Sequence, residues 1–241
     1  YTIQAVYKEL RGLQAEGGVV KTGRLYALSL PWISELSDMA EGARKQSLES
    51  IIRQASGKSS VEKVTVKFRN LFHLHEAWLQ VMRELVDYSE NKIVLGWNPH
   101  LWFDLLQDKQ ETSFSRYVEA SNGRLFLIVG GESSLDRSVA RNFPSRVVKC
   151  SFGQAPFARH DDLYVNIIGD SIVTLKIDKS MTDRIDALYE ETGSAKDLSF
   201  GEVMSVLSRP SKASLILERD KKKALSYRKK FTDFFGEKGT E

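Results

Sequence analysis

The sequence predicts an α/β domain over residues 61–241, preceded by a small helix-and-hairpin unit over residues 1–30 and a linker helix over residues 31–60. Short apolar runs at 92–97 and 124–131 have the length of buried strands, and helical patterns separate the strands from one another. Strands that alternate with helices form a mainly parallel or mixed sheet. A helix followed by a glycine pair and a basic ribbon sets the N-terminal unit apart.

The first element is a short helix whose apolar residues fall on one side. Val6, Leu10 and Leu13 are spaced by four and three residues, so they share a helix face, which we expect to pack. The glycine pair at 17–18 ends the helix, because glycine enters the left-handed conformation at a helix C-terminus without a steric cost. A two-stranded ribbon over residues 19–28 follows.

The other side of this helix and the tip of the ribbon are polar and basic. A basic surface of this kind suits the phosphates of duplex DNA. Gln4 and Tyr7, near the start of the helix, are placed to reach base edges, whereas basic side chains contact phosphates and set the register on the duplex. The alternative is a solvated helix face without a ligand. The predicted DNA-binding residues are Gln4, Tyr7, Lys8, Arg11, Lys21, Thr22 and Arg24.

The remaining elements are predicted from their hydrophobic periods. Pro31 opens the linker helix, which either pairs with its twin in a dimer or packs on its own domain. Alternating apolar residues at 63–68 predict a strand with one buried face, and a turn at 169–170 divides the run 163–177 into a hairpin. Further strands are expected at 92–97, 124–131, 146–152 and 212–218, and helices at 71–88, 102–106, 114–120, 180–191, 199–207 and 221–235.

The first helix and the ribbon also carry a family resemblance. The residues that carry it are Ala5, Val6, Tyr7, Lys8, Leu10, Leu13, Gly17 and the run Gly23, Arg24, Leu25 and Tyr26. In this order they resemble the winged helix-turn-helix domains of archaeal and bacterial transcriptional regulators. The resemblance implies that the helix is a recognition helix and the ribbon its wing. Because the chain begins at this helix, we expect the winged helix to be N-terminally incomplete.

Two segments of the C-terminal half carry a second resemblance. RHDDLYVNIIGDSIV at 159–173 and ASLILERDKKKALSYRKKFTDFF at 213–235 resemble the end of a phospholipase-D-like domain of the kind joined to winged helices in archaeal TrmB-like regulators. This implies a cytoplasmic, homodimeric transcriptional regulator that binds double-stranded DNA, with an α/β domain for effector sensing or dimerisation. The alternatives are a phospholipase-D-type nuclease or phosphodiesterase, and a protein–protein interaction module.

The composition places few limits on function. The 241 residues carry a formal net charge of +3, so a nucleic-acid-binding surface must be local. Residues 44–70 hold seven Lys or Arg against two Glu, a net charge of +5. The one cysteine, Cys150, permits no internal disulfide and fits a reducing cytoplasm. Because no apolar run approaches the roughly 20 residues of a membrane span, we expect no membrane partner.

The second resemblance raises the question of whether the chain carries a catalytic motif. Catalytic members of the phospholipase D superfamily carry His-x-Lys-x4-Asp, in which the histidine attacks phosphorus and the lysine holds a phosphate oxygen. His160 stands where this histidine would lie, but Asp162 and Ile167 occupy the lysine and aspartate positions. A carboxylate there repels phosphate, so we predict no catalytic residues and a chain that is not an enzyme.

Histidine and acidic residues elsewhere invite a metal-site interpretation. His73 and His75, beside Glu76, are two residues apart and point to different sides of a helix, whereas zinc ligands on helices favour three- or four-residue spacing. The acidic pair at 161–162 and Asp170 suit turn geometry. We therefore expect no metal and no cofactor.

Polar and aromatic residues that follow two of the expected strands predict an effector site. Ligands of α/β sheets bind beyond the carboxyl ends of strands, where backbone N–H groups and hydroxyls meet. An aromatic and amide cluster suits a sugar or nucleotide. The alternatives are a tight connection at 130–134 and a core position for at least one tryptophan. The predicted effector-binding residues are Trp97, Asn98, His100, Gly130, Gly131, Glu132, Ser133 and His160.

Overall fold

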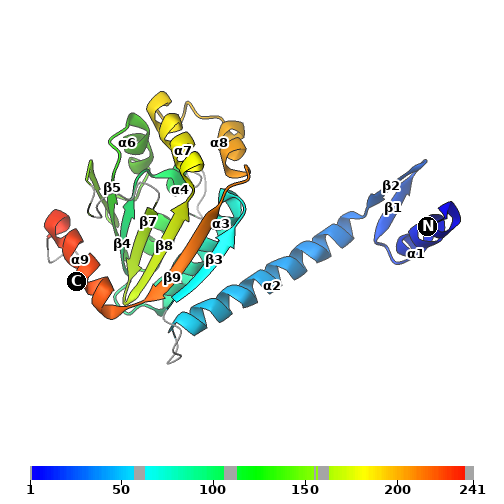
Figure 1. Cartoon of the computed structure of the whole chain (residues 1–241), viewed down its shortest axis with the longest axis horizontal. Coiled ribbons are helices and arrows are strands. Elements are labelled where there is room, and N and C mark those ends of the chain that lie inside the picture. Colours follow the sequence, from blue (N-terminus) through cyan, green and yellow to red (C-terminus); the bar gives the residue numbers. More distant parts are fainter. Residues whose placement is uncertain (1, 57–62, 106–112, 155, 157–162, 237–241) are drawn as a thin grey trace. The chain divides into compact units, whose positions relative to one another are not determined.

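The computed structural model describes residues 2–56, 63–105, 113–154, 156 and 163–236 (Figure 1). The chain divides into two compact units, Tyr1–Ser50 and Ile51–Glu241. The first holds a helix and a hairpin and the second holds a seven-stranded sheet. Helix α2 (Leu30–Ser56) contains the boundary between them.

The N-terminal unit contains helix α1 (Ile3–Ala15) and strands β1 (Val19–Thr22) and β2 (Leu25–Leu28). Thr2 caps the helix, since its hydroxyl oxygen accepts a hydrogen bond from the Ala5 N–H at 3.3 Å. The strands are antiparallel and pair Thr22 with Leu25, so a two-residue loop joins them. Gly23 takes the first loop position with a φ of +63°, where glycine is favoured. The helix and ribbon expected from the sequence are therefore both present.

One expectation for this unit is wrong, because the apolar face of α1 does not pack. No residue of α1 is buried, and Val6 and Leu13 are 48% and 43% exposed. The physical reason is the size of the hairpin. Its four-residue strands offer little apolar surface to a thirteen-residue helix, and Val19 is their buried residue.

Helix α2 begins directly after the hairpin, and Ser29 fixes its first turn. The Ser29 N–H donates to the Gly18 carbonyl at 3.0 Å, and its hydroxyl donates to the Gly17 carbonyl. The same hydroxyl oxygen accepts from the Trp32 N–H at 3.3 Å, so it serves as the N-cap. The start of α2 is therefore tied to the glycine pair that ends α1.

The C-terminal unit is built on a mixed sheet with the strand order β3-β9-β8-β7-β4-β5-β6. Its strands are β3 (Lys63–Phe68), β4 (Ile93–Asn98), β5 (Arg124–Val129), β6 (Val148–Phe152), β7 (Leu163–Ile168), β8 (Ser171–Ile177) and β9 (Ala213–Arg219). The neighbours β4–β5 and β5–β6 are parallel, and the other neighbouring pairs are antiparallel. The expected α/β class with a mixed sheet is confirmed.

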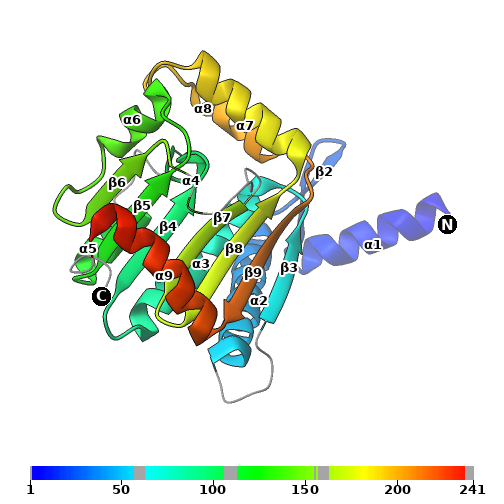
Figure 2. The ribbon, with the colours of Figure 1, turned by 60° about the vertical axis from the view of Figure 1, so that its left-hand side comes forward.

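Helices cover both faces of this sheet (Figure 2). The helices of this unit are α3 (Leu71–Tyr88), α4 (Trp102–Leu105), α5 (Phe114–Ala120), α6 (Ser134–Ala140), α7 (Lys179–Glu191), α8 (Phe200–Leu207) and α9 (Lys221–Phe235). On one face α9 buries Ala224 and Phe231 against the strands. On the other, α3 buries an apolar stripe made of Leu71, Leu74, Trp78, Val81, Met82 and Leu85. None of the described helices has both the length and the apolar composition of a membrane span.

Candidate functional site

A cavity of about 340 Å³ lies beyond the carboxyl ends of β4 and β5. Their parallel pairing brings the two following loops together. The N–H groups of Gly130 and Gly131 donate to the carbonyls of Asn98 and Pro99 at 2.9 and 2.7 Å, which fastens one loop to the other. Helix α7 supplies the rest of the wall. The lining residues are Trp97, Pro99, His100, Gly130, Gly131, Ser133, Asp186, Tyr189 and Glu190.

His100 is held between two carboxylates in the wall of this cavity. Its Nδ1 lies 2.9 Å from Oδ2 of Asp136, and its Nε2 lies 3.4 Å from Oδ1 of Asp186. The ring packs on Tyr189, with the two centroids 4.3 Å apart. A carboxylate on Nδ1 orients an imidazole, so the Nε2 of His100 faces both Asp186 and the cavity.

Asp136 is completely buried, and hydrogen bonds satisfy its carboxylate. Oδ1 accepts from the Leu101 N–H at 2.9 Å, and Oδ2 accepts from the Ser133 hydroxyl at 2.8 Å. The Ser133 hydroxyl oxygen also accepts from the Asp136 N–H at 3.0 Å, as the N-cap of α6. A buried charge is tolerated when it is paired and hydrogen-bonded, so this network fixes the position of His100.

The lining of the cavity combines aromatic rings with negative charge. Trp97, His100 and Tyr189 supply rings, and Asp186 and Glu190 supply carboxylates. The Tyr189 hydroxyl is buried and has no hydrogen-bond partner among the described residues. Burial raises the pKa of Tyr189 well above its usual value, so the hydroxyl is a neutral donor. A neutral or cationic ligand that carries hydroxyl or amino groups suits this lining, and a phosphate does not.

Five of the eight predicted effector-site residues lie together in this cavity: Trp97, His100, Gly130, Gly131 and Ser133. Asn98 and Glu132 are not among its lining residues. Asn98 is buried at the end of β4, and the Glu132 carboxylate pairs with Arg137 at 3.2 Å. His160 and the acidic pair at 161–162 lie outside the described residues.

Sequence reasoning missed Asp136, Asp186, Tyr189 and Glu190. Asp136 carried a usable signal, because it follows Ser133 by three residues, the spacing of an N-terminal capping pair. The three residues of α7 carried none. Hydrophobic periodicity predicts a helix there, but it says nothing about which edge of the sheet the helix approaches.

The predicted DNA-binding residues lie on the N-terminal unit. Gln4, Lys8 and Arg11 recur along one side of α1, and Tyr7 also lies on α1. The other three lie at the end of the hairpin. Lys21 Nζ is 5.6 Å from the ring centroid of Tyr26, its cross-strand partner. All seven side chains are exposed: Gln4, Tyr7, Lys8, Arg11, Lys21, Thr22 and Arg24.

The histidines of α3 are separated by their surroundings. His75 is buried and stacks on Phe103, with ring centroids 5.6 Å apart, whereas His73 is exposed. Burial, together with the charge of Arg83, lowers the pKa of His75 to about 4. Within the described ranges, no three His, Cys, Asp or Glu side chains are grouped to hold a metal ion.

No family model and no curated protein matches the chain. The solved structures that resemble it include the following two. TrmBL2, described as an archaeal chromatin protein with a novel mode of DNA binding, has 10% identity and a TM-score of 0.39 over 96% of this chain and 80% of that one. NucT from Helicobacter pylori has 11% identity and a TM-score of 0.39 over 72% of this chain and 96% of that one. Identities and TM-scores this low do not assign a function, so the function of this chain has to be argued from its own residues.

One prediction, that the chain is not an enzyme, is corrected. That prediction depended on the residues after His160. Asp162 lies outside the described residues, and Ile167 is buried in β7. The described residues instead contain a histidine–carboxylate pair, His100 and Asp136, which the motif at His160 did not include.

Proposed function

We propose that this chain is a DNA-binding transcriptional regulator that contacts duplex DNA through α1 and the β1–β2 hairpin. One observation carries the proposal: a single compact unit presents Lys8 and Arg11 on an exposed helix side and Lys21 and Arg24 on a hairpin. A helix fits the major groove of B-DNA, and an adjoining ribbon reaches the neighbouring backbone. In this proposal α1 and the hairpin are the recognition helix and the wing of a winged helix.

The seven residues divide into two roles. Gln4 and Tyr7, in the first turns of α1, would read base edges, and the four basic side chains would contact phosphates. Each neutralised phosphate releases counterions, so the logarithm of the affinity falls with the logarithm of the salt concentration by about 0.9 per contact. We therefore expect DNA binding that weakens steeply as salt rises.

The test is binding of the chain to a pool of random duplex DNA at low and at moderate salt. The double substitution Lys8→Ala and Arg11→Ala should weaken binding at least about tenfold and lower the salt slope by about 2. Lys221→Ala with Lys229→Ala is the matched control, because it removes the same charge from exposed positions of α9. An equal loss in both double variants would contradict a specific surface on α1.

The proposal gives the α/β unit a sensory role. The cavity at His100 would bind the effector, a neutral or cationic molecule with hydroxyl or amino groups, and α2 would pair two copies into a cytoplasmic homodimer. Two copies match the two half-sites of a two-fold operator and double the contact with DNA.

A catalytic role for the same cavity is the second candidate function, and the His100–Asp136 pair favours it. A histidine whose Nδ1 is bound to a buried carboxylate can act as a general base through Nε2. In a hydrolysis, Nε2 would take a proton from the attacking water as its oxygen bonds to the substrate, and would return that proton to the leaving group. Asp186 and Glu190 repel a phosphodiester, so this reaction suits a neutral substrate such as an ester.

Two chromogenic substrates separate the catalytic alternatives, p-nitrophenyl acetate and bis(p-nitrophenyl) phosphate. Loss of ester hydrolysis in His100→Gln but not in His160→Gln would support the general base at His100. Loss of phosphodiester hydrolysis in His160→Gln alone would support the phospholipase-D-type nuclease. No turnover above background by the unsubstituted chain would eliminate both reactions and leave the regulator.

A further inference from the structure

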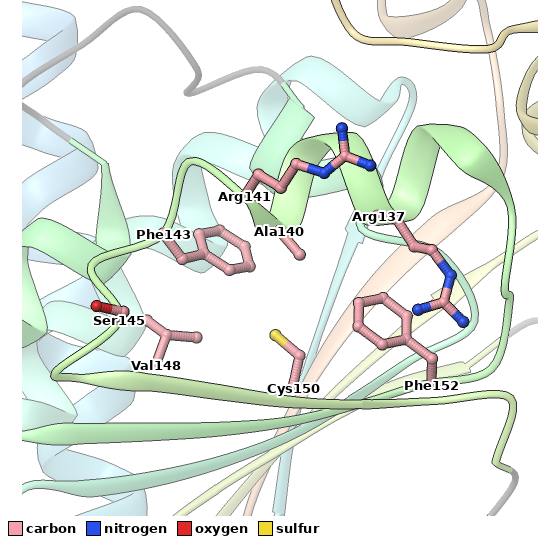
Figure 3. A pocket seen from close by; sticks show the side chains of 8 residues that line it. All are labelled: Arg137, Ala140, Arg141, Phe143, Ser145, Val148, Cys150 and Phe152. Carbon is pink, nitrogen blue, oxygen red and sulfur yellow. The ribbon is translucent and has the colours of Figure 1, made fainter.

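A second cavity, of about 440 Å³, lies between α6 and β6, the strand at one edge of the sheet (Figure 3). Its volume falls within the range of small-molecule sites. It shares no lining residue with the cavity at His100. Alternate residues of β6 face it, together with α6 and the segment that follows α6. The lining residues are Arg137, Ala140, Arg141, Phe143, Ser145, Val148, Cys150 and Phe152.

Two arginines give this cavity a positive charge. Arg137 lies 3.2 Å from Glu132, but both side chains are about half exposed, so water weakens that pair. The side chain of Arg141 is exposed and has no acidic partner in the described part of the chain. The described lining residues include no carboxylate. The cavity therefore favours an anion, in contrast to the acidic cavity at His100.

Aromatic rings form two of its walls. In Figure 3, Phe143 and Phe152 stand on opposite sides and Cys150 lies on the floor between them. The Arg137 guanidinium lies 4.9 Å from the Phe152 ring centroid, in cation–π contact. Burial raises the pKa of Cys150 to about 12, so the thiol adds no negative charge at neutral pH. A flat apolar ligand can contact both rings at once.

We propose that this cavity binds a small aromatic carboxylate. Its ring would lie between Phe143 and Phe152. The Arg141 guanidinium, which points away from Cys150 in Figure 3, would turn towards the cavity and donate two parallel hydrogen bonds to the carboxylate. The site goes beyond the DNA-binding proposal and does not depend on it. Substitutions at Arg141 should therefore leave the salt-dependent binding of DNA unchanged.

Equilibrium dialysis with 2-naphthoate tests the proposal, and 2-naphthamide is the control because it keeps the ring and lacks the charge. The carboxylate should bind at least about tenfold more tightly than the amide, since hydrogen bonds to charged groups are the stronger ones. Arg141→Gln should remove that difference. Arg124→Gln, an exposed position at the start of β5 outside the cavity, should preserve it.

The chain's single cysteine reports where the probe binds. Saturating 2-naphthoate should slow the alkylation of Cys150 by excess iodoacetamide in a prolonged reaction at alkaline pH, where a small fraction of this thiol is ionised, and the same concentration of the amide should not. Three results would overturn the proposal: no binding of 2-naphthoate at millimolar concentration, equal binding of acid and amide, or binding without protection of Cys150. The comparison of the two probes on the unsubstituted chain needs no variant to fold.

Discussion

Asp104, in α4, is a buried carboxyl whose ionisation opposes folding. Burial raises the pKa of Asp104 to about 7, from a value near 4 in an unfolded chain. Between these values the folded state binds more protons than the unfolded state. Below about pH 4 the Asp104 carboxyl is protonated in both states, and the free energy of unfolding is at its full value with respect to this group. That free energy falls as pH rises above about 4 and through about 7, because ionisation then favours the unfolded state.

Asp104→Asn should remove this dependence, because asparagine keeps the shape of the side chain and does not ionise. At pH 8 the variant should be more stable than the parent by roughly 2–4 kcal/mol, and the difference should shrink towards pH 4. Urea unfolding at several pH values measures it. Asp183→Asn, at an exposed position, is the control and should give little difference. A stability difference for Asp104→Asn that does not change with pH would contradict the assignment.

Gly131 permits the close approach of the His100 and Asp136 side chains. A Cβ at this position would lie 2.6 Å from Oδ2 of Asp136 and 2.7 Å from the His100 ring. Gly131→Ala should therefore lower the free energy of unfolding by about 1–3 kcal/mol, as overpacking does, and should weaken any activity or binding at His100. Gly201→Ala, in α8, is the control, because a Cβ there meets nothing closer than 3.9 Å. Equal stability of the two variants in thermal unfolding would refute the close packing.

At the scale of elements, helix α2 leaves an apolar stripe exposed. Ile33, Leu36 and Met39 recur at three-residue steps on one side of the helix and are each at least 43% exposed. A helix of 27 residues is about 40 Å long, which is ample for pairing with a second copy.

Ile33→Glu with Leu36→Glu should therefore shift the chain from dimer to monomer in light scattering, because both charges would be buried in the pair. Ser34→Glu with Ser37→Glu adds the same charge to exposed polar positions of the same helix and should leave the dimer intact. A parent chain that is monomeric at high micromolar concentration would refute pairing through α2.

Local patterns predicted most elements because each pattern needs only its own residues. The stripe of α3 and the turn at Gly169, where φ is +55°, are examples. Strand β6 begins two residues later than expected. The N–H groups of Val147 and Val148 both donate to the Pro144 carbonyl, which turns the chain at the expected start of the strand. Hydrogen bonding of this kind overrides an apolar run.

At the scale of the whole molecule, the order of the strands could not be predicted. Strand β3 pairs with β9, at the other end of the unit, and the hydrophobic period of one strand does not identify its partner. The loops after β4 and β5 were predicted to form a site because strand ends alone suggested it. The carboxylates of α7 and the cavity beside β6 were not, because they depend on which elements meet at each edge of the sheet.

The two units should differ in hydrogen exchange, and DNA should change that difference. Amides of α1 should exchange through openings that cost several kcal/mol less than those of β4 and β5, because α1 has no buried residue and these strands lie in the core. If α1 and the hairpin contact DNA, duplex DNA should slow their exchange. Lys8→Ala with Arg11→Ala should abolish that slowing, and Lys221→Ala with Lys229→Ala should not. Slowing confined to the C-terminal unit would place the DNA surface on the sheet domain and refute the role proposed for α1.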